Sequence, residues 1–328
     1  MPNLIPPVRF QATGILQLYI VPHTGSYQIA TAGAQGGGHG LAPGGKGALM
    51  RGVFHLRAGE ILHLVVGRQG TPGMSLPPVP GPDQELAGPA FPSEAGTVLR
   101  GGGGGGGSFV WKGTSRGGRP VWPLLAAGGG GGGGAFAGGD GVVTLDAPRS
   151  DGRGGRNGSG GSSDTESFYY TGGGGAGWLT PGVHGAGPTY CRGGSHWEGG
   201  EGACFGGYQG GHGGFGGGGA GSFFGAGSGG GGGYSGGAGG GGRKGIPSGG
   251  GGSYNAGREQ LNHAGFQPGD GFVAIVAVPT PITLLADESN APQEITPARS
   301  GTCPGPGHFS ESLTLKLLRQ ARWGYHAN

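Results

Sequence analysis

The sequence is poor in charged residues, hydrophobic residues and cysteine. Charged residues make up 11% of its 328 residues and hydrophobic residues 33%, so it matches neither a charge-rich disordered chain nor an average globular one. Its three cysteines, Cys191, Cys204 and Cys303, are too few for a disulfide scaffold. A net charge of +3 is too small to indicate nucleic-acid binding by itself.

Membrane-directing segments are also absent from the sequence. The first ten residues lack the basic stretch, apolar stretch and small-residue cleavage site of a signal peptide. No run of about 18 apolar residues occurs, so no transmembrane helix is predicted.

Glycine is the residue in excess. Of 94 glycines, 69 lie between residues 101 and 257, in runs such as 101–107 and 128–134. Each glycine costs roughly 0.5 to 1 kcal/mol relative to alanine when it is fixed in regular structure, so the runs are either flexible linkers or strongly hydrogen-bonded. Threefold extended helices of the polyproline II type direct their N–H and C=O groups sideways, and without Cβ atoms they can pack and bond to one another. Aromatic residues such as Trp111, Trp122 and Trp178 interrupt the runs and favour this ordered interpretation.

Alternating apolar residues predict strands around the glycine runs. Leu16, Leu18 and Ile20, for example, alternate with Gln17 and Tyr19. The predicted strands pair into three hairpins: 16–20 with 26–31, 53–56 with 61–66, and 108–111 with 120–125. Prolines in the third hairpin indicate a sheet edge, whereas residues 271–278, apolar on both faces, predict a central strand.

Composition divides the chain into three parts. These are an N-terminal extension at 1–8, a glycine-rich β domain at 9–280, and a linker and tail at 281–328. The domain is predicted to be strand-rich at 9–145 and rich in glycine runs at 101–257, with a proline-rich exposed loop at 71–92 and a closing strand at 271–278. In the tail, residues 311–323 are a candidate short helix.

Four phrases of the sequence, taken in order, resemble one known family. They are LQLYIVPHTGSYQIATAGAQGG, GGKGALMRGVFHLRAGEILHLVVGRQG, RGGGGGGGSFVWKG continued by VWPLLAAGGGGGGG, and GGFGGGGAGSFFGAGSGGGGGYSGGAGGGG. Over residues 9–278 this succession is similar to the glycine-rich extracellular domain of the anaplastic lymphoma kinase and leukocyte tyrosine kinase receptors. The resemblance implies an all-β fold, a jelly-roll antiparallel sandwich of tumour-necrosis-factor type with an inserted polyglycine II helix bundle. It also implies display outside the cell and binding of small helical, cytokine-like protein ligands.

The sequence departs from these receptors in carrying no kinase motif, transmembrane helix or cysteine-rich module. The expected function is therefore that of a noncatalytic protein-recognition module, extracellular or at the cell surface, with no cofactor and no membrane span. No local motif identifies ligand-contact residues. Two alternatives stay open: a structural or adhesive glycine-rich protein of the cell surface or matrix, and an RGG-type nucleic-acid binder. The second alternative rests on four arginines that each precede two glycines, Arg100, Arg116, Arg153 and Arg192.

Few residues are candidates for chemistry. Residues 40–47 approach a phosphate loop but end in Gly47, where serine or threonine is needed, and Ser235 matches a nucleophile pattern without its strand-turn-helix context. The histidines near the cysteines match no zinc spacing, so no catalytic, cofactor or metal residue is predicted. Cys191 and Cys204 are a candidate disulfide, and Asn157, in the motif Asn-Gly-Ser, is a candidate N-glycosylation site.

Overall fold

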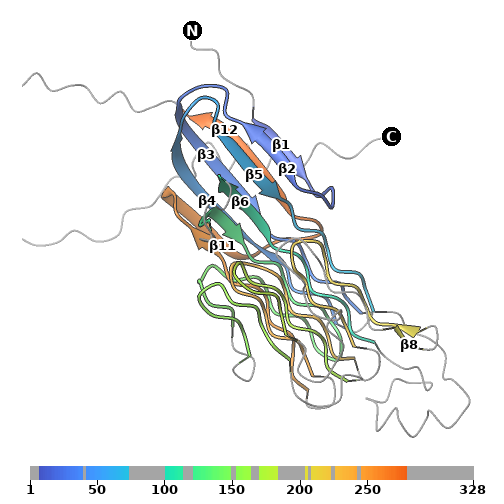
Figure 1. The fold of residues 1–328 in the computed structure, drawn as a ribbon. Helices are drawn as coiled ribbons and strands as arrows, with labels where there is room; N and C mark the ends of the chain where they lie inside the picture. Colours follow the sequence, from blue (N-terminus) through green and yellow to red (C-terminus); the bar gives the residue numbers. More distant parts are fainter. Residues whose placement is uncertain are drawn as a thin grey trace, which may run out of the picture. The chain divides into compact units, whose positions relative to one another are not determined.

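The chain folds into an all-β unit. The computed structural model describes residues 7–39, 42–73, 100–113, 121–148, 153–163, 170–183, 204–205, 208–222, 226–241 and 245–278. All of these lie in one compact unit, Met1–Pro281. They form antiparallel strands and no helix, as the sequence predicts (Figure 1). The candidate helix at 311–323 and most of the proline-rich loop lie outside the described residues.

The strands make two five-stranded sheets and a small ribbon. The first sheet has the order β1-β12-β3-β4-β11, with the bounds Val8–Gln11, Phe272–Val278, Gly25–Ala32, Gly47–Leu56 and Arg258–Gln267. The second sheet has the order β10-β7-β6-β5-β2, with the bounds Tyr254–Asn255, Pro123–Ala127, Ser108–Lys112, Ile61–Val65 and Gln17–Ile20. β8 (Cys204–Phe205) and β9 (Tyr208–Gln209) pair in the ribbon.

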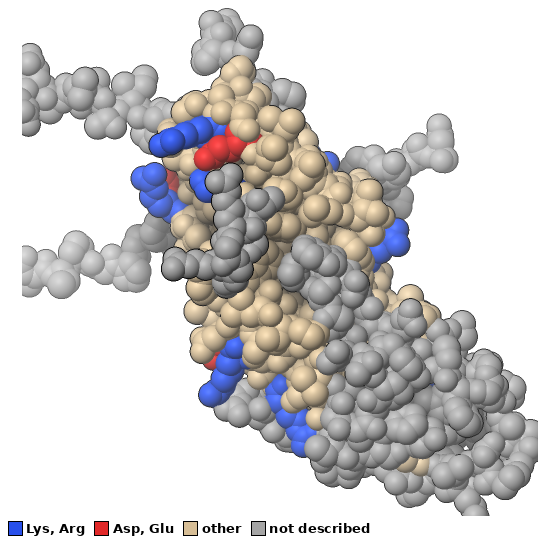
Figure 2. Space-filling view, viewed as in Figure 1, with Lys and Arg blue, Asp and Glu red and all other residues tan. Residues whose placement is uncertain are grey.

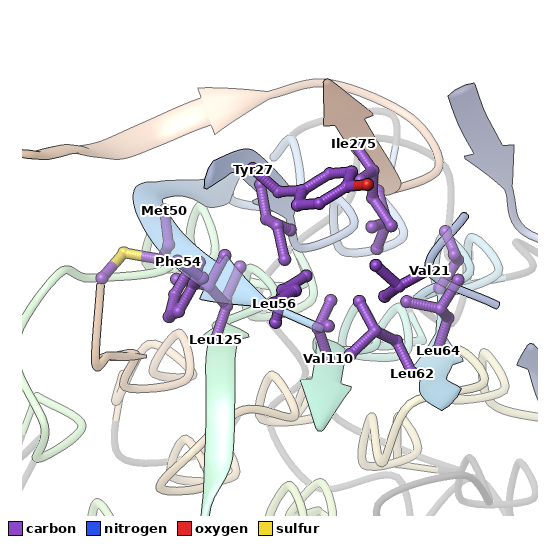
Figure 3. Close-up of a cluster of buried hydrophobic side chains, with 14 residues drawn as sticks. Val21, Tyr27, Met50, Phe54, Leu56, Leu62, Leu64, Val110, Leu125 and Ile275 are labelled. Carbon is purple, nitrogen blue, oxygen red and sulfur yellow. The ribbon is translucent and has the colours of Figure 1, made fainter. Parts of the chain in front are cut away.

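The main hydrophobic core lies between the two sheets. Alternate residues of each strand point inward, so that Tyr27 and Ile275 of the first sheet face Leu62, Leu64 and Val110 of the second (Figure 3). These five side chains are almost completely buried. The position of β12 between β1 and β3 confirms the prediction of a central closing strand.

Two of the three predicted hairpins are wrong in their pairing. β2 and β3 follow one another in sequence, but β2 pairs with β5 and β3 pairs with β4 and β12. β4 and β5 are likewise consecutive but belong to different sheets. The turns before Gly25 and at Arg57 therefore carry the chain from one sheet to the other. Strands that are neighbours in sequence face one another across the core, where each buries its apolar face, and do not pair side by side.

The third hairpin is confirmed, since β6 and β7 pair in antiparallel register. Its predicted edge position is wrong, because the two-residue strand β10 flanks β7 on its other side. β7 begins at Pro123, and β10 pairs only with Leu125 and Ala126. The proline therefore stands at the first residue of the strand, where it removes no hydrogen bond to β10.

Several strands continue directly into glycine-rich segments, which run away from the sheets (Figure 1). Run 101–107 leads into β6, and run 128–134 follows β7. In run 101–107, N–H groups three residues apart donate to carbonyl oxygens of the same neighbouring segment. The pairs are Gly102 and Gly105 to Gly133 and Gly130, Gly103 and Gly106 to Thr71 and Arg68, and Gly104 and Gly107 to Gly219 and Gly216. Run 229–233 repeats the pattern with other partners, such as Gly229 and Gly232 to Gly102 and Gly105.

Neighbouring glycine segments touch through their main chains. A Cβ atom added at Gly104 would stand well inside 3.0 Å of the Gly230 carbonyl oxygen, a separation that real Cβ atoms essentially never show. Glycine is therefore required there by the close approach of another backbone.

Buried serines join the sheets to the glycine segments. Ser108, at the start of β6, donates its hydroxyl to the Ala32 carbonyl oxygen at 2.6 Å and accepts the Gly67 N–H at 2.8 Å. Ser253 similarly donates to the Val142 carbonyl oxygen, and it accepts the N–H of Gly128, just after β7, at 2.9 Å. These hydroxyls satisfy main-chain groups where the regular hydrogen bonding of the strands stops.

Candidate interaction face on the second sheet

Five aliphatic side chains are exposed on and beside the edge strand β2. Tyr19 points inward and contacts Phe10 edge-on, with 6.1 Å between ring centroids. Leu18 and Ile20 consequently point outward and are 56% and 65% exposed. Ile61, the register partner of Ile20 on β5, is 45% exposed. We call the exposed set Ile15, Leu16, Leu18, Ile20 and Ile61 the aliphatic strip.

The exposure of β2 is the reverse of the usual pattern. A strand with apolar residues at every second position ordinarily turns them toward the core. In β2 the inward position between the sheets belongs to Tyr19, which leaves Leu18 and Ile20 on the outer face. Sequence reasoning finds the strand but misses the strip, because alternation does not say which of its two faces is buried.

The chain along β2 itself carries no charged residue, although the Arg68 guanidinium lies beside Gly14 at one end of the strip. Residues 12–22 contain no aspartate, glutamate, lysine or arginine, although exposed sheet edges commonly carry charges that prevent pairing with other chains. Within the described residues β2 pairs with β5 alone. A neutral, apolar group of side chains at a sheet edge is typical of a contact surface for another macromolecule.

An ion pair borders the strip. Lys112 Nζ lies 3.3 Å from Glu60 Oε1, and Glu60 Oε2 accepts the Arg57 N–H at 3.1 Å. Burial acts to raise the pKa of Glu60, but the hydrogen bonds from Arg57 and Lys112 outweigh it and lower that pKa. Figure 2 shows the charged side chains in small separate groups, with wide areas of neither sign between them. An apolar centre with a polar rim is the common layout of protein interfaces.

Aromatic rings extend the apolar face across the second sheet. His63 follows Leu18 in the cross-strand register and stacks on Trp111, with 5.3 Å between centroids. Trp178 covers Trp111 edge-on at 5.6 Å and donates its indole N–H to the Val121 carbonyl oxygen at 2.9 Å. Both tryptophans are buried, so they form the floor of the face.

A group of three rings lies on the same side of the second sheet, near its other edge. Tyr254, on β10, pairs with Ala126 of β7 and contacts Tyr234 and Trp122. Trp122 is 59% exposed. We call Trp122, Tyr234 and Tyr254 the aromatic cluster. The face as a whole thus carries exposed apolar groups near both edges.

The residues singled out from the sequence do not meet in one site. Asn157 is exposed in a turn and has a left-handed φ of 47°, and its N–H bonds to Asp146 Oδ1 at 3.0 Å. Cys204 lies in β8, whereas Cys191 is outside the described residues, so the candidate disulfide stays a prediction. Arg100, the first of the arginines in the nucleic-acid alternative, is only 2% exposed and is not presented at the surface.

The weak chemical motifs have structural roles. Ser235 is fully buried and its hydroxyl accepts the Gly158 N–H at 3.0 Å. The Lys46 N–H donates to the Asp140 carboxylate at 2.7 Å, an arrangement that disfavours a phosphate there. The described part of the chain contains no group of three metal-ligating side chains and no helix able to cross a membrane.

Comparison with known proteins adds no family assignment. No protein-family model matches the sequence, and no curated protein matches it. Function is therefore inferred from the surface described above.

Proposed function

We propose that the chain is a noncatalytic protein-recognition module, displayed outside the cell, whose protein partner docks on the aliphatic strip. The observation that carries the proposal is the outward exposure of Leu18, Ile20 and Ile61 on an uncharged sheet edge. The resemblance to the receptor ectodomains supports a partner that is a small helical secreted protein.

The strip is large enough to matter energetically. The exposed fractions of its five side chains add up to the equivalent of about three fully exposed aliphatic residues. Full burial of one such side chain contributes roughly 1.5 to 3 kcal/mol. Covering the strip would then contribute on the order of 4 to 8 kcal/mol before the loss of translational and rotational freedom. That amount supports a specific contact when the polar rim adds further hydrogen bonds.

We further propose that the two sheets form a jelly roll and that the glycine runs form a bundle of polyglycine II helices. Support for the bundle comes from the hydrogen bonds of run 101–107, in which every third amide donates to the same neighbour. A helix with three residues per turn presents its amides to three neighbours in just this rotation. In the proposed module the bundle is a stiff base that holds the two sheets in place.

The test is a binding measurement on the whole chain with a panel of small helical secreted proteins. Ile20→Glu should weaken any specific binding about tenfold or more, because it places a charge in the apolar contact. Val143→Glu is the matched control, since Val143 is 38% exposed and outside the strip. Equal binding by wild type and Ile20→Glu, or equal losses in both variants, would contradict docking on the strip.

A structural or adhesive role is the alternative that the hydrogen-bonded glycine segments favour. Such a protein would need stiffness but no specific partner. The two functions differ in the Ile20→Glu variant: adhesion carried by the bundle would be unchanged, whereas recognition through the strip would be lost.

A further inference from the structure

β2 has main-chain hydrogen-bonding groups along its outer edge that no described residue uses. It ends the strand order of the second sheet and pairs only with β5 within the described residues (Figure 1). The Val21 N–H donates to the Glu60 carbonyl oxygen at 2.9 Å, which fixes the phase of the antiparallel ladder. Tyr19, two residues earlier, therefore bonds to β5 as well, whereas the N–H and C=O groups of Leu18 and Ile20 point to the free edge. No described residue bonds to these four groups.

The other three edge strands of the two sheets carry features that hinder pairing with another chain. β1 contains Arg9, and β10 is only two residues long. β11 contains Arg258 and Glu259, its register with β4 shifts twice, and Glu259 has a left-handed φ of 50°. β2 has none of these features, and the Arg68 guanidinium lies beyond its end, next to Gly14. Because proteins commonly blunt their sheet edges in these ways, an unprotected edge indicates a place where another chain pairs.

The two residues with free main-chain groups also belong to the aliphatic strip. The side chains of Leu18 and Ile20 are 56% and 65% exposed on the outer face of the second sheet. Residues directly opposite one another in an antiparallel pair share a face of the sheet, with their Cβ atoms about 5 Å apart. An added strand would therefore place the side chains opposite Leu18 and Ile20 against the strip. Those side chains should be apolar and should alternate with residues that point the other way.

An extended segment of a partner fits this edge better than a second copy of the chain. β2 is four residues long and offers two of them for new bonds, whereas a stable complex of two folded proteins buries about 1,200 Å² or more. Edge pairing by itself is therefore too small to hold two copies together. A segment of a partner that also covers the aliphatic strip has the missing contact area. The segment should be uncharged, because a charge set against the strip would lose its hydration without gaining an ion pair.

We propose that the protein partner adds an extended, uncharged segment to the free edge of β2 as a further antiparallel strand, with apolar residues opposite Leu18 and Ile20. The inference rests on the proposed function, because it names the part of the partner that reaches the aliphatic strip. Main-chain bonds to the edge supply affinity, and the alternate apolar side chains supply specificity. In a small helical protein, such a segment comes from a chain terminus or from a loop between helices.

The first arm of the test titrates the whole chain with two isomeric peptides by saturation-transfer NMR. Both are acetylated and amidated pentapeptides in which three threonines alternate with two isoleucines. One peptide carries N-methyl groups on two threonines, which leaves the N–H groups of both isoleucines free to bond to β2. Its isomer carries the two N-methyl groups on the isoleucines, so the edge that faces β2 is blocked. We expect the isomer to bind about tenfold more weakly or less, because it loses main-chain hydrogen bonds. Equal binding of the two isomers would overturn the proposal.

The second arm compares Leu18→Pro with Leu18→Ala, using the threonine-methylated peptide. Proline removes the N–H that points to the free edge and no bond to β5, whereas alanine shortens the side chain and keeps that N–H. Leu18→Pro should weaken peptide binding about tenfold more than Leu18→Ala does. Native-like circular dichroism of both variants excludes misfolding as the cause of a loss.

The same variants separate this inference from the proposed function. A panel protein whose binding is lost in Ile20→Glu but is equal in Leu18→Pro and Leu18→Ala docks on the strip without adding a strand, and strand addition is overturned. The peptides test the edge without any panel protein, so this arm can be read even if docking on the strip fails. Sedimentation of the chain alone tests the other occupant: a dimer that Leu18→Pro dissociates would assign the edge to a second copy and overturn the proposal.

Discussion

Replacing Gly104 by alanine tests whether the glycine segments are packed through their main chains. The added Cβ would collide with the Gly230 carbonyl oxygen, and a main-chain group cannot rotate away as a side chain can. Overpacking typically costs 1 to 3 kcal/mol, so a rigid neighbour puts the expected loss of unfolding free energy near the top, at about 3 kcal/mol. For a unit of this size that loss lowers the melting temperature by roughly 6 to 12 °C.

Gly25→Ala is the matched control. Nothing lies within 4 Å of the position that its Cβ would take, and its φ is not in the left-handed region. We expect it to be neutral or to stabilise by about 0.4 to 1 kcal/mol, because alanine restricts the unfolded chain. Urea unfolding followed by circular dichroism gives both values. If Gly104→Ala is as stable as Gly25→Ala, the close packing of the runs is refuted.

Two further predictions concern a buried hydroxyl and a tyrosine. Ser108→Ala removes the acceptor of the Gly67 N–H inside the protein, so urea unfolding should show a loss of about 1 to 3 kcal/mol; an unchanged midpoint would mean that this bond contributes nothing. The pKa of Tyr234 is raised above its ordinary value of 10.0, so the protonated phenol adds to the free energy of unfolding. This contribution is complete below the ordinary pKa and is lost as the pH rises through the raised one. Tyr234→Phe should therefore make the alkaline fall of the melting temperature less steep, and an identical fall in both proteins would contradict the assignment.

The sequence predicts strands better than it predicts their partners. Period-two alternation identifies β2 and β3, because half-buried strands need it whatever they pair with, and the continuous apolar run of 271–278 identifies β12. Pairing depends on which sheet each strand joins, and the turns at Gly25 and Arg57 look the same whether they close a hairpin or cross between layers. β11 escapes prediction because this edge strand is largely polar and only partly buried.

The candidate surface is still less accessible to sequence reasoning. The alternation of Leu18 and Ile20 with Gln17 and Tyr19 does not show which face of β2 is buried. The packing of Tyr19 against the core is what places Leu18 and Ile20 on the outer face. Trp122 lies eleven residues from Trp111 in sequence, and nothing in the spacing separates an exposed ring from a buried one.

The glycine segments have a thermodynamic consequence. Unfolding them exposes mainly peptide groups, and hydration of polar surface lowers the heat capacity whereas hydration of apolar surface raises it. The heat-capacity change per residue should therefore fall below the usual value of about 12 to 15 cal/mol/K. A smaller change gives a flatter stability curve, so the glycine-rich half is held by interactions that do not weaken on cooling as hydrophobic contacts do. Cold would then loosen the apolar sandwich before it loosened the segments that have no side chains at all.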